Sequence, residues 1–290
     1  MSANKKKKKE IKIRSGIPPS ILFLMITFVL IVGVSLLAPV LFPTDLGATN
    51  LRARLMAPSF LDDSSPYLFG TDSVGRDLAV RVLYATRMTV KIAFTGMVFA
   101  LVIGTVLGIL AGMCGGKVDL FVTFLSDARQ SIPNTFIGIF CACFFGGGEG
   151  MIILVIALTG WSAYTKLMRS QILQLKEAKY IECSRAMGAS GLRIAVEHIL
   201  PNMASLLIVR ATMSLSAYIL LESSLSYLGL GIQPPQTSLG VLISEGRDYL
   251  TNQWWLAIIP SIVMIFLIMQ VSLLGDWVRD KLDPKLKNRS

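Results

Sequence analysis

Few side chains in this sequence are of the types that carry out chemistry, and their spacing excludes most enzymes. His198 is the only histidine, so the chain by itself forms neither a Ser-His-Asp triad nor a site with several histidine ligands. Cys141 and Cys143 have no histidine or second cysteine pair nearby, as a zinc site would require. The sequence also lacks an HExxH motif and the paired aspartates of an intramembrane protease. We therefore expect a chain that is not an enzyme and that itself binds no metal or cofactor.

The segment Gly70–Asp77, GTDSVGRD, has the Gly-x-x-x-x-Gly frame of a phosphate-binding loop. Arg76 and Asp77 stand where such a loop carries Lys and Ser or Thr, and no strand pattern precedes it. We predict instead a turn in which Asp72 and Arg76 bond to each other locally.

A polar segment between Lys166 and Pro201 is the most informative part of the chain, because it is too polar to cross lipid yet rich in helix-forming residues. Apolar residues are interleaved among its charges, at Ile181, Ala186, Leu192 and Val196. This pattern predicts two short helices that are broken at Gly188–Gly191. A short helix with small residues and a glycine break suits insertion into a groove on another protein. The alternative is a helix that lies on lipid headgroups.

The elements that position these segments are membrane helices. Only 16% of the 290 residues are charged and 53% are hydrophobic, whereas soluble domains average about 25% charged residues. A helix needs about 20 mostly apolar residues to cross a bilayer. Six segments qualify, which predicts an all-α polytopic membrane protein with spans near 20–42, 88–112, 123–145, 150–168, 203–222 and 254–275.

Basic residues set the orientation of these spans. Most of the 28 Lys and Arg residues lie in the tails and in the connections that share a side with them, which predicts that both termini are cytoplasmic. The apolar stretch after the lysine run is longer than a signal peptide usually has, so we expect a retained anchor. The predicted organisation is a basic tail over 1–19, a first transmembrane helix over 20–42, an extracytoplasmic segment over 43–87, a core of five transmembrane helices over 88–275 with a cytoplasmic loop at 169–202, and a tail over 276–290.

Several residues inside the predicted spans call for a physical reason. Gly104, Gly108 and Gly112 are four residues apart, which favours close helix packing. Pro133 interrupts the third span as a hinge or a packing kink, and Asp127 and Arg129 are expected where that span opens, near the cytoplasmic face.

Two charges lie toward the limits of the fifth span. Arg210 falls about 13 Å beyond Pro201 along a helix, and it either faces a cavity or a partner, or extends to the inner interface. Glu222, near the outer end, either contacts a substrate or caps a neighbouring element.

The polar loop resembles the EAA loop of permeases in binding-protein-dependent ABC importers. Glu182, Gly188 and the pair Leu200–Pro201 match that pattern at the right spacing. Cys183 and Ser184 stand where two alanines are usual, and His198 stands at a position that is usually apolar.

Three further segments resemble the dipeptide, oligopeptide and nickel branch of that family: GTDSVGRD with the arginines that follow it, SLSYLGLGIQPP at 224–235, and LLGDWVRDKLDP at 273–284. Their order and the short first loop are similar to the second permease of such systems, often called the C component. The resemblance extends over nearly the whole of 70–284.

The resemblance implies a type I importer (MetI-like) fold that works by alternating access in the inner membrane of a prokaryote. Its implied partners are a second homologous permease, two cytoplasmic ATPases that hold ATP and Mg, and an external solute-binding protein, besides the lipid bilayer and without nucleic acid. The residues implied to dock on an ATPase are Glu182, Cys183, Ser184, Ala186, Met187, Gly188, Ala189, Leu200 and Pro201. Residues expected along the pathway or gate are Arg210, Glu222, Gly229 and Gly231.

The implied cargo is a di- or oligopeptide, with a nickel chelate or another small solute as the alternative. A secondary transporter that acts alone is the competing class. It would predict paired acidic residues in the middle of a span, and Arg210 is the one deep candidate that the sequence offers.

Overall fold

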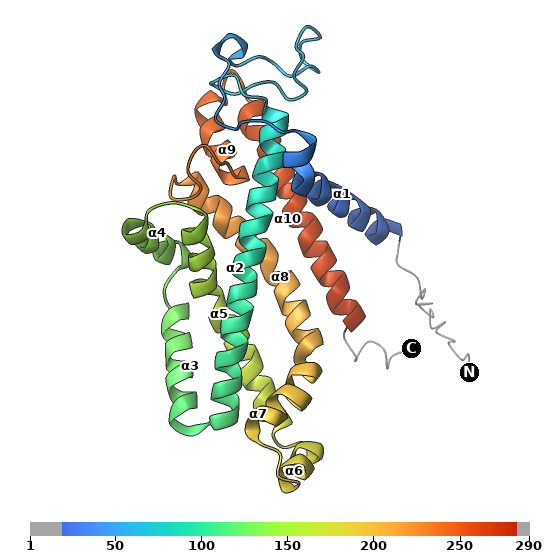
Figure 1. Cartoon of the computed structure of the whole chain (residues 1–290), viewed down its shortest axis with the longest axis vertical. Coiled ribbons are helices and arrows are strands. Elements are labelled where there is room, and N and C mark those ends of the chain that lie inside the picture. The colour runs from blue at the N-terminus through green and yellow to red at the C-terminus, as the bar shows by residue number, and fades with distance from the viewer. Residues whose placement is uncertain (1–18, 283–290) are drawn as a thin grey trace, which may run out of the picture.

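The computed structural model describes residues 19–282, which are helical with irregular connections (Figure 1). The predictions for the basic tail and for the last residues of the C-terminal tail fall outside this range. The helices in chain order are α1 (Pro19–Leu41), a 3-10 turn (Leu51–Ala53), α2 (Leu78–Cys114), α3 (Gly116–Gln130), α4 (Asn134–Phe145), α5 (Glu149–Leu175), α6 (Lys179–Ala186), α7 (Gly191–Ile194), a π-helical turn (Ala195–Ile199), α8 (Leu200–Tyr227), α9 (Leu239–Gly246), a 3-10 turn (Arg247–Tyr249) and α10 (Trp255–Leu282).

Five of the described helices are long and apolar enough to cross a membrane: α1, α2, α5, the continuous helix that ends in α8, and α10. Each contains or closely matches one predicted span. Helix α2 begins ten residues before its predicted span, because the carboxylate of Asp77 caps it by accepting hydrogen bonds from the backbone N–H groups of Ala79 and Val80.

The third predicted span is two helices, α3 and the shorter apolar α4, which meet at Pro133. Proline has no N–H to donate, so the break falls where its ring begins the next helix. Arg129 holds this break against α5, because its guanidinium donates to the carbonyls of Leu158 and Thr159 and to the side chain of Asn134.

The expected position of Asp127 and Arg129 near the cytoplasmic face is wrong. Helix α3 starts at Gly116, so both residues lie at its far end, beside the middle of α5. The predicted span began at residue 123, and its apolar pattern did not show that the helix already starts at Gly116.

The predicted packing role of the glycine stripe on α2 is confirmed. A Cβ on Gly104 would lie 2.3 Å from the carbonyl oxygen of Trp161, and one on Gly108 would lie 2.5 Å from the Cβ of Met168. Because only glycine fits there, α2 and α5 approach closely and form the centre of the bundle. The hydroxyl of Thr165 donates to the carbonyl of Gly104 across this contact.

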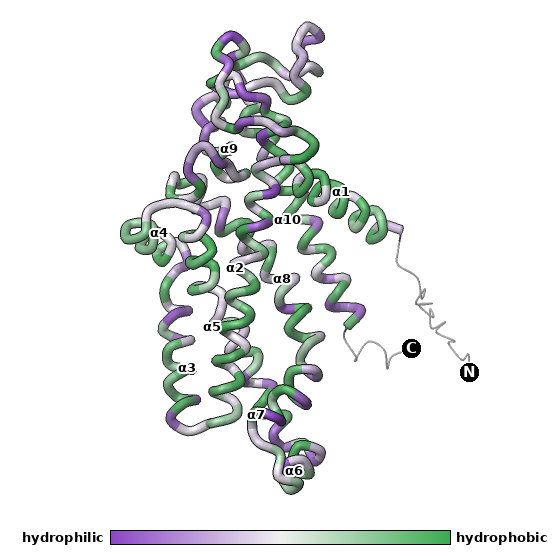
Figure 2. Tube along the Cα trace, viewed as in Figure 1, coloured by the Kyte–Doolittle hydropathy of each residue, from purple (hydrophilic) through white to green (hydrophobic). Residues whose placement is uncertain are grey.

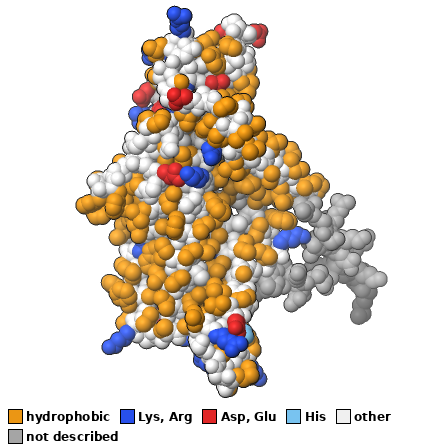
Figure 3. All heavy atoms as spheres, in the orientation of Figure 1, with side chains coloured by type: hydrophobic (Ala, Val, Ile, Leu, Met, Phe, Trp, Pro, Cys, Tyr) orange, Lys and Arg blue, Asp and Glu red, His pale blue; other side chains and the backbone are white. Residues whose placement is uncertain are grey.

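Polar residues gather at the two ends of the molecule, and the helices between them carry apolar side chains on their outer surface (Figures 2 and 3). One end holds α9 and the 43–77 segment, and the other holds α6 and α7 (Figure 1). The polar loop and the segment that contains GTDSVGRD therefore lie on opposite sides of the membrane-spanning bundle.

Candidate functional site

The polar loop forms two short helices, as the sequence predicts, followed by a π-helical turn that the sequence did not predict. Helix α6 ends at Ala186, and Gly188 then adopts a φ of +86°, a left-handed conformation that favours glycine. Ser190 caps α7 by accepting a hydrogen bond from the backbone N–H of Arg193. The π-helical turn joins α7 to α8 without a break, so α6 lies at the foot of a continuous membrane helix.

The loop presents an exposed apolar surface. Ile181 is buried against the bundle, whereas 81% of Met187 and 76% of Leu192 are exposed. Glu182, Cys183 and Ala186 also lie on the exposed side. An exposed set of this kind at the tip of a protein is typical of a surface that another protein covers.

Ser184 and His198, both departures from the EAA pattern, are hydrogen-bonded to each other. The Oγ atom of Ser184 on α6 lies 3.0 Å from Nε2 of His198 in the π-helical turn. The ring of Tyr180 packs edge-on against the imidazole, with 6.2 Å between the ring centroids. The side-chain amide of Asn202 on α8 donates a hydrogen bond to the hydroxyl of Tyr180. Helix α6 is thus attached to the start of α8 by side chains as well as by the backbone.

The remaining loop candidates are spread over the same tip. Ala189 is half-buried beneath the break, and Leu200 and Pro201 begin α8. Glu182 lies in the first turn of α6 and has no basic side chain within 4.0 Å in the part of the chain that the structure describes. Its carboxylate is therefore free to meet a group from outside the chain.

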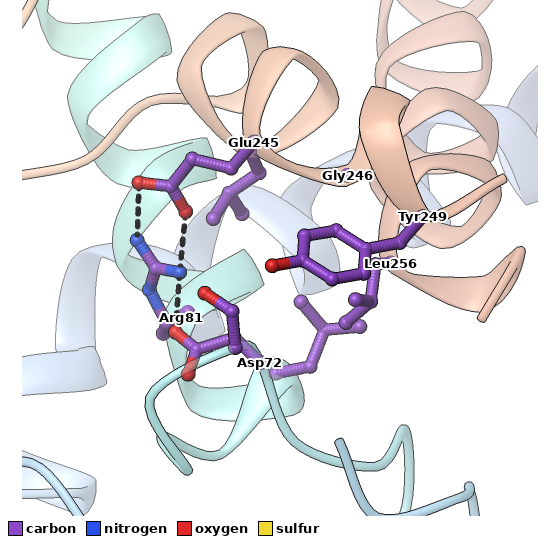
Figure 4. A pocket seen from close by; sticks show the side chains of 9 residues that line it. Asp72, Arg81, Glu245, Gly246, Tyr249 and Leu256 are labelled. Carbon is purple, nitrogen blue, oxygen red and sulfur yellow. Dashed lines mark hydrogen bonds and ion pairs between the residues drawn. The ribbon is translucent and has the colours of Figure 1, made fainter. Parts of the chain in front are cut away.

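A cluster of charges ties the opposite end of the bundle together (Figure 4). Arg81 of α2 contacts Asp72 and Glu245, each at 2.7 Å, and Arg76 lies 2.6 Å from Asp72. The predicted turn is confirmed, but it is part of a larger network, since Glu245 comes from α9. Sequence reasoning missed Glu245, because nothing local links it to a residue so far away in the chain.

Asp72 is held ionised by this network. Burial acts to raise the pKa of its carboxyl group, but the backbone N–H groups of Arg76 and Val74 and the charge of Arg81 outweigh burial and lower the pKa below its usual value. The adjoining pocket, lined by Tyr249 and Leu256, encloses about 10 Å³ and has room for one water molecule. The ion pairs of this cluster therefore link α2 to α9, and the pocket beside them is too small for a solute.

Glu222 is completely buried at the junction of α8, α2 and α9. Its carboxylate accepts hydrogen bonds from Thr89 at 2.9 Å, Ser226 at 2.7 Å and Ser223 at 3.2 Å. The hydroxyl of Thr89 also accepts from the first backbone N–H of α9, that of Leu239. Of the two interpretations of Glu222, bonding to neighbouring elements accounts for this geometry.

Gly229 and Gly231 shape the connection that follows α8. Gly229 has a φ of +79°, and a Cβ on Gly231 would lie 2.0 Å from the hydroxyl of Ser226. Arg210 is on α8 at an exposed position, and no carboxylate lies within 4.0 Å of it in residues 19–282. The structure therefore does not bring the four predicted pathway residues together, because Glu222 is buried, whereas Arg210 is exposed on the half of α8 that is nearer to α6.

Comparison with known proteins gives a consistent result. Residues 104–288 match the family of binding-protein-dependent transport system inner membrane components. The chain is 37% identical to the dipeptide transport system permease protein DppC of Haemophilus influenzae over 90% of its length and 89% of that protein. It is 33% identical to the probable D,D-dipeptide transport system permease protein DdpC of Escherichia coli, over 90% of this chain and 86% of the relative.

A structural likeness supports the fold. An inward-facing structure of the MetNI methionine ABC transporter aligns with a TM-score of 0.59 and 18% sequence identity, over 71% of this chain and 98% of that one.

Proposed function

The chain belongs to the family of binding-protein-dependent transport system inner membrane components, and we propose from this premise that it is one of two permeases in an ATP-driven importer of di- or oligopeptides. The peptide cargo is supported by the names of its relatives, which are dipeptide and di/tripeptide permeases from several bacteria. A nickel chelate remains the second candidate only through the wider resemblance of the sequence.

In the proposed assembly, this permease pairs with a second homologous permease, and each seats its loop on a cytoplasmic ATPase. The observation that supports this docking is the exposed apolar tip at α6 and α7, where no other part of the described chain covers Met187 and Leu192. ATP and Mg are bound by the ATPases and not by this subunit. A solute-binding protein delivers the peptide at the opposite end, where α9 and the 43–77 segment lie.

The geometry suggests how motion of an ATPase reaches the membrane. Helix α6 is attached to the foot of α8 through Ser184 and His198, and α8 is attached to α2 and α9 at its other end through Glu222. When the ATPases close on ATP, the two loops move together and the helices rock from an inward-facing to an outward-facing state, and hydrolysis reverses the change. Both termini lie in the cytoplasm in this arrangement, as the distribution of Lys and Arg predicts.

Replacing Gly188 by leucine tests the docking role. The positive φ at Gly188 and the open space around it mean that leucine strains the backbone by about 1–2 kcal/mol and adds bulk to the docking surface. We expect normal insertion and abundance with a strong loss of ATP-driven peptide uptake in proteoliposomes that contain the whole complex.

Gly116→Leu is the matched control for this experiment. Gly116 also has a positive φ, +54°, and open space around it, and it is the first residue of α3, outside the coupling loop. We expect it to retain uptake. Uptake at the wild-type rate by Gly188→Leu at equal abundance would exclude docking through this tip.

A further inference from the structure

We infer the limits of the hydrocarbon core from two ion pairs along α5. Lys91 of α2 lies 2.7 Å from Glu149, the first residue of α5. Arg169, which bonds Asp119 of α3 at 2.7 Å, lies about 30 Å further along the helix at 1.5 Å per residue. This distance equals the usual thickness of the hydrocarbon core, about 30 Å. Side chains that contact α5 between these two ion pairs therefore lie at membrane depth.

A third ion pair lies between these limits. The ammonium group of Lys166 on α5 is 2.7 Å from the Oδ1 atom of Asp127 on α3. Asp127 lies about 12 Å deeper than Asp119 along α3. Lysines near a membrane boundary usually extend toward water, but Lys166 bonds to this deeper carboxylate instead.

The pair is open to its surroundings, since 43% of the Lys166 side chain and 59% of the Asp127 side chain are exposed. Charged groups at this depth face a water-filled cavity or a protein partner and not lipid tails. In a permease that forms its pathway with a second subunit, the exposed face where α3 meets α5 thus belongs on the inner side of the assembly.

We propose that Asp127 and Lys166 form a contact site in the translocation pathway for a solute that carries both an ammonium and a carboxylate group, such as a peptide with free termini. The inference rests on the proposed function. A zwitterion that enters between the two side chains replaces one ion pair by two, with its ammonium on Asp127 and its carboxylate on Lys166. A solute with one charge leaves a protein charge unpaired at membrane depth, which is costly.

The ion pair between Asp119 and Arg169 provides a matched control. It also joins α3 to α5, but it is less exposed, at 31% for Arg169 and 19% for Asp119, and it lies at the cytoplasmic limit of the core. A purely structural link between the helices would depend on both pairs alike, whereas a solute site depends on Asp127 and Lys166 alone.

The test uses the complete importer in proteoliposomes, with a peptide, its N-acetyl form and its C-terminal amide, all shown first to bind the same solute-binding protein. Lys166→Gln is expected to lower the ratio of free-peptide to amide uptake about tenfold, since hydrogen bonds to charged groups contribute about 1.5–3 kcal/mol. Asp127→Asn is expected to lower the ratio of free to N-acetyl peptide by a similar factor. The exchange Asp127→Lys/Lys166→Asp keeps an ion pair between α3 and α5, and it should still lower both ratios.

The exchange Asp119→Arg/Arg169→Asp should leave both ratios unchanged. Wild-type ratios in the two single variants, or an equal change in the control exchange, would overturn the contact site. Failure of the wild-type complex to take up any peptide would instead refute the proposed function, so the two failures are distinguishable.

Discussion

At the scale of single residues, Ser184 and His198 show how two departures from a family pattern depend on each other. Ser184 is buried and His198 is half-buried, so either residue alone would leave a polar group without a partner, which costs about 1–3 kcal/mol. Together they form a hydrogen bond of 3.0 Å between α6 and the π-helical turn. Because either group can donate, the bond does not depend on one protonation state of the imidazole.

A double-mutant cycle tests this dependence. We expect Ser184→Ala and His198→Leu each to lower the amount of peptide imported per ATP hydrolysed, because each leaves the other partner unsatisfied and loosens α6. The double variant restores the usual apolar pattern and should recover most of this ratio, with a coupling energy of about 1 kcal/mol.

His198→Gln serves as the conservative control for the cycle, since its amide reaches as far as Nε2 and can bond Ser184. Strictly additive losses in the double variant, with no recovery by His198→Gln, would show that the bond does not attach α6 to α8.

At the scale of helices, the contact between α2 and α5 determines the architecture. Lipid tails are as apolar as the helix surfaces, so association depends on close packing rather than on exclusion of water. Gly96, Gly104, Gly108 and Gly112 all lie against α5, where a Cβ would approach its atoms to less than 3.0 Å. The stripe thus allows the backbones to come close enough for Thr165 to bond Gly104.

Gly104→Ala should therefore destabilise the bundle. The added methyl group meets the backbone of Trp161, which cannot rotate away, so the helices must separate at a cost of about 1–3 kcal/mol. A lower midpoint of thermal unfolding in detergent is the expected result. Gly33→Ala in α1, where a Cβ meets nothing within 4 Å, is the control and should leave the midpoint unchanged; equal midpoints for the two variants would contradict the packing role.

At the scale of the whole molecule, the two ends of the bundle are fastened differently. The end with α9 is held by the buried carboxylates of Glu222 and Asp72, whereas the end with α6 leaves Met187 and Leu192 uncovered. One end is thus held together by contacts within the chain, whereas the other presents an uncovered apolar surface, as the proposed docking on an ATPase requires.

Labelling of single cysteines determines which end of the bundle faces the cytoplasm. In a variant that retains only Cys114, an exposed residue at the α6 end of α2, an impermeant maleimide should react only after the cells are permeabilised. A variant whose sole cysteine is Ser64→Cys, in the exposed segment at the other end, should react in intact cells. The reverse pattern would place the termini outside the cytoplasm.

The sequence by itself determined the features that depend on neighbours along the chain. Long apolar runs identified the membrane helices, the break at Gly188 followed from local backbone preference, and the spacing of Gly104 and Gly108 predicted a packing stripe. The local bond between Asp72 and Arg76 was predicted for the same reason.

Only the tertiary structure decided which distant polar groups meet. Arg81 finds Glu245, Asp127 finds Lys166, and Ser184 finds His198 because separate helices are brought to the same level, and no local spacing encodes such a meeting. It also placed Asp127 near the far end of α3, since this helix already begins at Gly116. Hydrophobicity and backbone preference are properties of a segment, whereas the partner of a charge is a property of the folded arrangement.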